Sequence, residues 1–213
     1  MMRDDGEDMR VFAALGDIVY SISRKELIEQ GFLSDAIVEY HKCGFDLSQD
    51  RYLNYSEIYK KHVVENNNRN ELIIEQIRQN VINSKKILVL VSQVEHGNNL
   101  FNWLQNMNLN KNGIWLNGKS KKEEREQDLS KFDVIIATQI FDEGVDLPSL
   151  DVVILAAGGK SSIKLTQRVG RVLRPLPGKK ALIVDFIDTP KYLVDHYHKR
   201  RKLLEEDFEV IDK

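Results

Sequence analysis

Three arginines recur at every third position around residue 170 and could bind a phosphate group. Arg168, Arg171 and Arg174 belong to the stretch Gln-Arg-Val-Gly-Arg-Val-Leu-Arg. Planar, forked guanidinium donors match phosphate oxygens. The spacing predicts a helix with a basic stripe beside a buried apolar face. An ordinary solvated helix, with its last arginine favoured by the helix dipole, would carry the same stripe, so both interpretations stand at this point.

Two neighbouring residues favour phosphate binding. Gly170 costs about 1 kcal/mol relative to alanine inside a helix, which is reasonable where a ligand or another backbone must come close. Pro175 follows Arg174 directly and ends the helix, so this guanidinium lies at the end of an element beside a rigid turn. The stretch is therefore a candidate phosphate-binding site.

The elements that must position these arginines alternate between strands and loops. Residues 132–138 form a β-branched run, typical of a strand buried on both faces of a parallel sheet. A polar, turn-forming loop follows at 139–148, and residues 151–155 predict the next strand. Ser161 and Ser162 can cap the helix that carries the arginines.

The rest of the chain repeats this alternation of apolar runs and amphipathic segments. We predict further strands at 17–22, 36–41, 86–91, 113–116 and 181–186. Amphipathic patterns predict one helix that ends near residue 82, with a cap signal at 66–68, and another helix after residue 93. A strongly charged segment predicts a helix at 120–131, and a basic helix follows residue 190.

Composition limits the classes of protein and of site. Thirty-one basic and thirty-three acidic residues leave a net charge of −2, so bulk charge does not support nucleic-acid binding. The single cysteine, Cys43, excludes an intramolecular disulfide and suits a reducing interior. No run of about 18 apolar residues predicts a membrane span, and the acidic start is unlike a signal peptide. His196 and His198 are two apart and point to different sides of a helix, so we predict no metal site.

Two stretches resemble motifs V and VI of superfamily 2 helicases. Residues 138–146 read Thr-x-x-x-x-Glu-Gly-x-Asp, and residues 167–174 read Gln-Arg-x-Gly-Arg-x-x-Arg. The resemblance implies that Arg171 and Arg174 are arginine fingers for the ATP γ-phosphate, where they would offset developing charge. It further implies two sets of contacts. Residues near the nucleotide would be Gln167, Arg168, Gly144 and Asp146, and Thr138 would contact a nucleic-acid phosphate.

Two weaker matches extend the resemblance. The strand at 86–91 and the residues after it resemble motif IV, which implies that Ser92 and Gln93 touch the nucleic-acid backbone. Gly118 and Arg125 match motif IVa. The resemblance implies that the glycine turn and the arginine of this motif help to hold the nucleic-acid strand. A helix that begins after Gln93 would also present free N–H groups to phosphate.

The family implies an α/β fold, a RecA-like three-layer sandwich with a mostly parallel central sheet and helices on both faces. We expect residues 1–14 to be a flexible lead or linker, 15–188 the helicase C-terminal RecA-like domain, and 189–213 a basic helix. The likeness is to the branch with phage branch-migration helicases and the eukaryotic repair and transcription helicase. Gln167 stands where the DEAD-box pattern of motif VI has histidine, and the resemblance then implies translocation, often on DNA, and not local RNA unwinding.

The chain has no P-loop. Gly159-Lys160-Ser161 ends like one, but Ile154 stands where the first glycine is needed. We therefore expect a separate N-terminal RecA-like domain of the same protein to bind most of the ATP and Mg²⁺, and this fragment alone to be inactive. DNA is the expected partner, with RNA possible, in an intracellular setting that would be the host cytoplasm for a virus. The alternatives are the motor subunit of a restriction enzyme and a non-catalytic nucleic-acid- or protein-binding platform.

Overall fold

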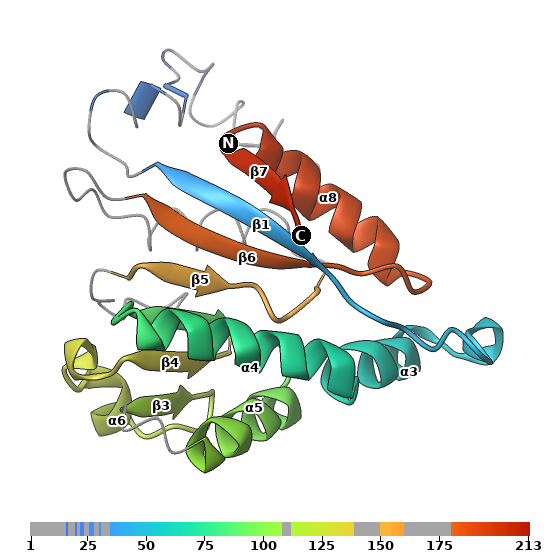
Figure 1. Ribbon diagram of the computed structural model, residues 1–213, viewed down its shortest axis with the longest axis horizontal. Coiled ribbons are helices and arrows are strands. Elements are labelled where there is room, and N and C mark those ends of the chain that lie inside the picture. Colours follow the sequence, from blue (N-terminus) through green and yellow to red (C-terminus); the bar gives the residue numbers. More distant parts are fainter. Residues whose placement is uncertain are drawn as a thin grey trace.

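A single sheet of parallel strands organises the molecule. The computed structural model describes residues 35–107, 112–138, 150–159 and 180–213, with isolated positions (16, 20, 22, 23, 26, 27 and 30) before them. Within this part the strand order is β3-β4-β2-β5-β6-β1-β7, and every neighbouring pair runs parallel (Figure 1). The strands are β1 (Ala36–Lys42), β2 (Ile87–Leu90), β3 (Gly113–Leu116), β4 (Val134–Ala137), β5 (Val152–Ile154), β6 (Ala181–Ile187) and β7 (Glu209–Asp212).

Helices cover both faces of this sheet, and each face has its own core. On one face α4 and α5 pack over Ile87 and Val89 of β2. On the other face α8 packs over a core that includes Leu88 and Leu90 of the same strand. The described helices are α3 (Tyr55–Tyr59), α4 (Asn67–Ile82), α5 (Val94–Asn106), α6 (Lys122–Glu126) and α8 (Leu193–Glu205), with shorter turns η1 (Asp50–Tyr52), η2 (Lys60–Val64) and η3 (Leu129–Lys131). The predicted three-layer α/β architecture is therefore confirmed.

Local signals explain where α4 begins and how closely α5 packs. The side chain of Asn66 caps α4 by accepting a hydrogen bond from the backbone N–H of Arg69 at 3.1 Å. A Cβ on Gly97 of α5 would lie 2.0 Å from the ring of Trp115 on β3, so only glycine lets this helix approach the sheet. The cap predicted at 66–68 is thus confirmed.

Two segments differ from the sequence predictions. The helix predicted at 120–131 is wrong in extent, because α6 ends at Glu126 and Gln127 is extended. The chain then turns so that Leu129 is buried, and the side chain of Asp128 caps the short turn η3. After residue 189 the sequence predicts only a basic helix, whereas the structure adds β7, which pairs with β1.

The described residues do not cover every prediction. The strand predicted at 17–22 and the helix predicted at 161–174 lie outside the described ranges. The strand at 36–41 is confirmed as β1, whose side chains alternate between buried and partly exposed along its length. In the part of the chain that the structure describes, no helix is long and apolar enough to cross a membrane.

Candidate functional site

Several predicted contact residues follow strands that end at one edge of the sheet. Because the strands are parallel, their carboxyl ends meet there, and open α/β sheets bind ligands at this edge. Ser92 and Gln93 follow β2, and Thr138 follows β4. Leu90 and Ala137, the last residues of these two strands, are partners in the sheet register. The structure therefore brings Ser92, Gln93 and Thr138 to the same edge.

The motif IVa residues divide between this edge and a nearby helix. Gly118 lies two residues beyond β3, is exposed, and has open space where a side chain would project. The backbone N–H of Thr138 donates to the carbonyl of Leu116 at 3.1 Å, which continues the pairing of β3 and β4. Arg125 lies on α6, is half-buried, and its Nε has no hydrogen-bond partner among the described residues. Gly118 therefore lies at the carboxyl edge of the sheet. Arg125 has a buried Nε donor that no described residue accepts from.

The loop at 155–159, here called the β5 loop, leaves the sheet at the same edge. The Tyr59 hydroxyl on α3 donates to the carbonyl of Ala157, and the Arg69 Nη1 on α4 donates to the carbonyl of Ala156 at 2.7 Å. Burial raises the pKa of Tyr59 to about 12, so the hydroxyl keeps its proton at neutral pH. Ser92 lies close to the Tyr59 hydroxyl and partly offsets this rise in pKa. One side chain therefore connects a predicted nucleic-acid contact with the β5 loop.

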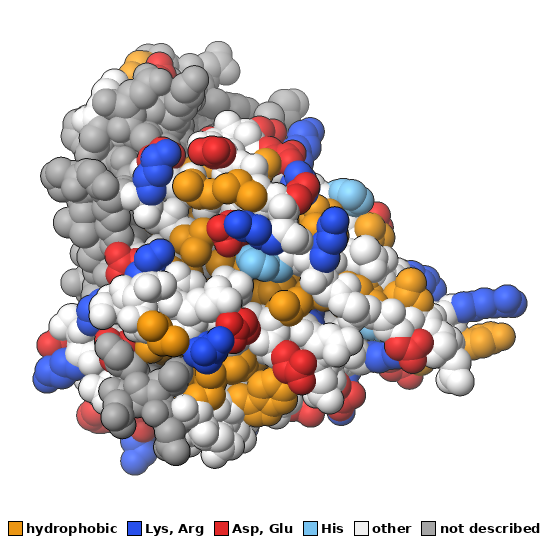
Figure 2. Space-filling view, in the orientation of Figure 1, with side chains coloured by type: hydrophobic (Ala, Val, Ile, Leu, Met, Phe, Trp, Pro, Cys, Tyr) orange, Lys and Arg blue, Asp and Glu red, His pale blue; other side chains and the backbone are white. Residues whose placement is uncertain are grey.

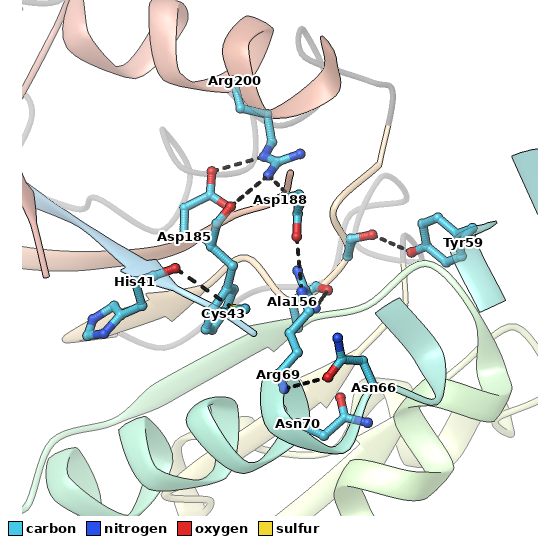
Figure 3. A network of polar contacts seen from close by, with 12 residues as sticks. His41, Cys43, Tyr59, Asn66, Arg69, Asn70, Ala156, Asp185, Asp188 and Arg200 are labelled. Atoms are coloured by element: carbon cyan, nitrogen blue, oxygen red, sulfur yellow. Dashed lines mark hydrogen bonds and ion pairs between the residues drawn. The ribbon is translucent and has the colours of Figure 1, made fainter. Parts of the chain in front are cut away.

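A buried network of two arginines and two aspartates holds the end of β6. Asp188 accepts from the Nε of Arg69 at 3.2 Å and from the Nη2 of Arg200 at 3.0 Å. Arg200 also donates from its Nε to Asp185 at 2.9 Å. Figure 3 shows the two guanidinium groups reaching Asp188 from α4 and α8, which cover opposite faces of the sheet. The network ties both helical layers to the carboxyl edge.

Glycine is required where the β5 loop passes this network. Gly158 has a φ of +59°, and a Cβ there would lie 3.1 Å from the Oδ2 of Asp188. A Cβ on Gly159 would lie 3.4 Å from the Oγ of Ser92. The loop therefore passes tightly against Asp188 and lies next to Ser92.

Sequence reasoning missed the structural roles of Arg69, Asp188 and Arg200. Arg69 and Asp188 are 119 positions apart, so no local spacing marks them as a pair. Tyr59 packs inside the domain, with only 3% of its surface exposed. The sequence feature that could have indicated this buried network was Asp185, an acidic residue inside the apolar strand β6.

The predicted nucleotide-binding residues belong to other segments of the chain. They are Gln167, Arg168, Arg171, Arg174, Gly144 and Asp146, and all six lie outside the described residues. Among the residues that the structure describes, no group of three histidine, cysteine or acidic side chains could hold a metal ion. His196 is buried on α8 and His198 is exposed.

Comparison with known proteins identifies a family and several relatives. The family described as "Helicase conserved C-terminal domain" matches residues 68–175. A protein of Sulfolobus islandicus filamentous virus (isolate Iceland/Hveragerdi) named "Putative helicase 22" is 29% identical over 99% of this chain and 40% of its own length. The "DNA 3'-5' translocase XPB2" of Sulfurisphaera tokodaii is 37% identical over 39% of this chain and 20% of its own length.

Solved structures share the fold. UvsW of T4 superposes with a TM-score of 0.62 at 22% identity, over 86% of this chain and 41% of UvsW. At that identity the likeness concerns the fold. The chain spans less than half the length of each of these three proteins.

Proposed function

Because this chain belongs to the helicase conserved C-terminal domain family of superfamily 2 helicases, we propose that it is the C-terminal motor domain of an ATP-dependent helicase or translocase. In this proposal ATP and Mg²⁺ are held mainly by an N-terminal RecA-like domain of the same protein. DNA is the preferred nucleic acid, which the naming of the XPB2 relative as a DNA translocase supports. We place the protein inside a cell, or inside the host cell if its source is viral.

The observation that carries the proposal is the arrangement at the carboxyl edge of the sheet. Ser92 and Thr138 follow neighbouring strands β2 and β4, which suits two contacts on successive phosphates of one strand. The β5 loop leaves the same edge, where nucleotides bind in open α/β sheets. Arg171 and Arg174 follow this loop in the sequence. Tyr59 joins the two regions through Ser92 and Ala157.

Each residue then has a physical task. Arg171 and Arg174 would neutralise the charge that develops on the transferred γ-phosphoryl group. Gln167, Arg168, Gly144 and Asp146 would line the nucleotide side. Thr138, Ser92, Gln93, Gly118 and Arg125 would hold the nucleic-acid backbone. Opening and closing of the two domains during the ATP cycle would shift these backbone contacts along the strand.

The test is ATP hydrolysis by the full-length protein, with and without single-stranded DNA. Arg171→Ala and Arg174→Ala should each lower the DNA-stimulated rate constant about 1000-fold, because an arginine finger acts mainly in the transition state. Arg78→Ala is the matched control, since Arg78 is an exposed arginine paired with Glu75 on α4. Rates equal to those of Arg78→Ala would refute the finger assignment. Replacing DNA by RNA of the same sequence tests the preferred nucleic acid.

A further inference from the structure

A polar pocket between α4 and α5 has no role in the proposed motor function. Its volume is about 270 Å³, which is near the lower end for a small-ligand site. Four asparagines line it, together with Glu65 and Trp103. No lysine or arginine is among its lining residues. Figure 2 shows acidic and basic side chains interspersed on the face of the molecule that α4 and α5 cover in Figure 1.

The floor of the pocket is fixed before any ligand arrives. Asn70 is 4% exposed, and its Nδ2 donates to the carbonyl of Val64 at 3.0 Å. Its Oδ1 lies 2.9 Å from the Nε2 of His96, which must donate because Asn70 offers an oxygen there. Burial, followed by repulsion from Arg69, lowers the pKa of His96 to about 3, so the ring is neutral. The amide of Asn70 is therefore structural, and the pocket is preorganised.

The other three amides are available to a ligand. Asn99 and Asn102 are three positions apart on α5 and so share one side of the helix, and Asn67 lies in the first turn of α4. None of the three side-chain amides makes a hydrogen bond with the described part of the chain. Each amide offers a donor and an acceptor side by side. The pocket therefore suits a ligand whose edge also alternates donors and acceptors.

A carboxylate and an aromatic ring of the pocket further restrict the class of ligand that it can bind. Glu65 can accept from an amino group but repels phosphate, and its ion pair with Lys60 at 3.3 Å leaves other carboxylate lone pairs open. A guanidinium group carries only donors and would leave the amide N–H groups unmatched. Trp103 is half-buried against the core and also lines the pocket, where its ring can stack on a flat ligand.

We propose that this pocket binds a nucleobase with an exocyclic amino group, adenine above all. Asparagine reads adenine through paired donor and acceptor groups, and a glutamate accepts from an exocyclic amine. The sugar and phosphate stay outside the pocket. The base could belong to a single strand or to a free nucleoside, since the recognising chemistry is the same.

The position of the pocket suits a base on a strand held at the carboxyl edge. Helix α5 begins at Val94, directly after Ser92 and Gln93. Asn99 lies six positions after Gln93, which is about 9 Å along the helix axis. A strand whose phosphates contact Ser92 could therefore place a neighbouring base in the pocket. Nucleoside binding itself does not depend on the proposed motor function.

The experiment is calorimetric titration of the full-length protein with adenosine, cytidine and uridine. Saturating Mg²⁺–UDP is present throughout to occupy the nucleotide site of the motor, because uracil lacks the exocyclic amino group that the pocket would recognise. Adenosine should bind more tightly than uridine, and the double variant Asn99→Ala/Asn102→Ala should weaken adenosine binding about tenfold. Trp103→Ala should also weaken it, about fivefold, whereas Trp103→Phe should retain most of the stacking. Asn106→Ala, an exposed asparagine at the end of the same helix, is the matched control.

Short oligonucleotides separate the two sources of the base. If the base comes from a strand, the double variant should weaken binding of an adenine-containing oligonucleotide and leave an abasic one unchanged. If the ligand is a free nucleoside, only the adenosine titration should respond. Equal adenosine affinity in the double variant and in Asn106→Ala would overturn the proposal. Binding of acetyl-arginine amide in place of every nucleoside would also overturn it. The ATPase rates of Arg171→Ala and Arg174→Ala test the motor function alone and do not affect this proposal.

Discussion

Removal of Arg69 should destabilise the protein far more than removal of an equally well-paired arginine on the same helix. Arg69 is fully buried, and it binds both Asp188 and the carbonyl of Ala156. Its guanidinium also lies 4.7 Å from the ring centroid of Phe186. Arg69→Ala would therefore leave a buried carboxylate short of one partner and a buried carbonyl without its donor.

The expected cost can be worked from these contacts. Removing one partner from a buried ion pair costs about 3–5 kcal/mol. The lower part of that range applies because Asp188 keeps its bond to Arg200 at 3.0 Å. The unpaired carbonyl of Ala156 adds about 1 kcal/mol. We expect Arg69→Ala to lower the free energy of unfolding by about 4 kcal/mol, which corresponds to a urea midpoint about 2 M lower.

Equilibrium urea unfolding of this chain, followed by circular dichroism, is the measurement. Arg78→Ala is the control, because Arg78 is exposed on α4 and pairs with Glu75 at 2.7 Å. That pair is shorter than the 3.2 Å pair of Arg69 and Asp188, so distance alone would rank the two variants in the opposite order. Arg69→Met keeps most of the volume and should be nearly as destabilised as Arg69→Ala. Midpoint shifts of equal size for Arg69→Ala and Arg78→Ala would refute the reasoning.

Two further predictions concern a buried histidine and the carboxyl edge. Burial and the positive charge of Arg69 lower the pKa of His96 to about 3, so the unfolded chain binds one more proton than the folded chain between about pH 6.5 and pH 3. Unfolding free energy should therefore fall by about 2 kcal/mol from pH 7 to pH 5 on account of His96, and urea titrations of His96→Gln should lack this contribution. An unchanged pH dependence in His96→Gln would contradict a buried neutral ring. Thr138→Ala should weaken single-stranded DNA binding by the full-length protein about fivefold at fixed salt, and Thr138→Ser should restore it; equal affinity in all three proteins, measured by fluorescence anisotropy, would remove Thr138 from the interface.

The central strands β2, β4 and β5 were predictable because they are buried on both faces. A β-branched run such as 86–91 has few alternatives to a buried strand, and β2 lies inside it at Ile87–Leu90. The edge strand β7 was not predicted, because its four residues are partly exposed and carry acidic ends. The charged helix at 120–131 was overextended, since charge pairing suggested one helix while burial of Leu129 required a turn.

The candidate site was only partly predictable. Ser92, Gln93, Gly118 and Thr138 each follow a strand in the sequence, and the parallel sheet then brings the four together. Nothing in the local pattern indicated that Tyr59 would connect Ser92 to Ala157, because the tyrosine and this alanine are 98 positions apart. The pocket between α4 and α5 could not be predicted either, because its asparagines come from two helices and their packing cannot be deduced from local sequence patterns.

The amino-acid sequence by itself determined the periodicity of the strands and helices and the two helicase motifs, because both depend on residues that are close together along the chain. Tertiary structure alone decided which distant charges become buried partners. Arg69 is an ordinary arginine in the sequence, and the fold places it between Asp188 and Ala156 at the sheet edge. The strength of such contacts depends on the loss of solvent around them, which exists only when all the layers have packed.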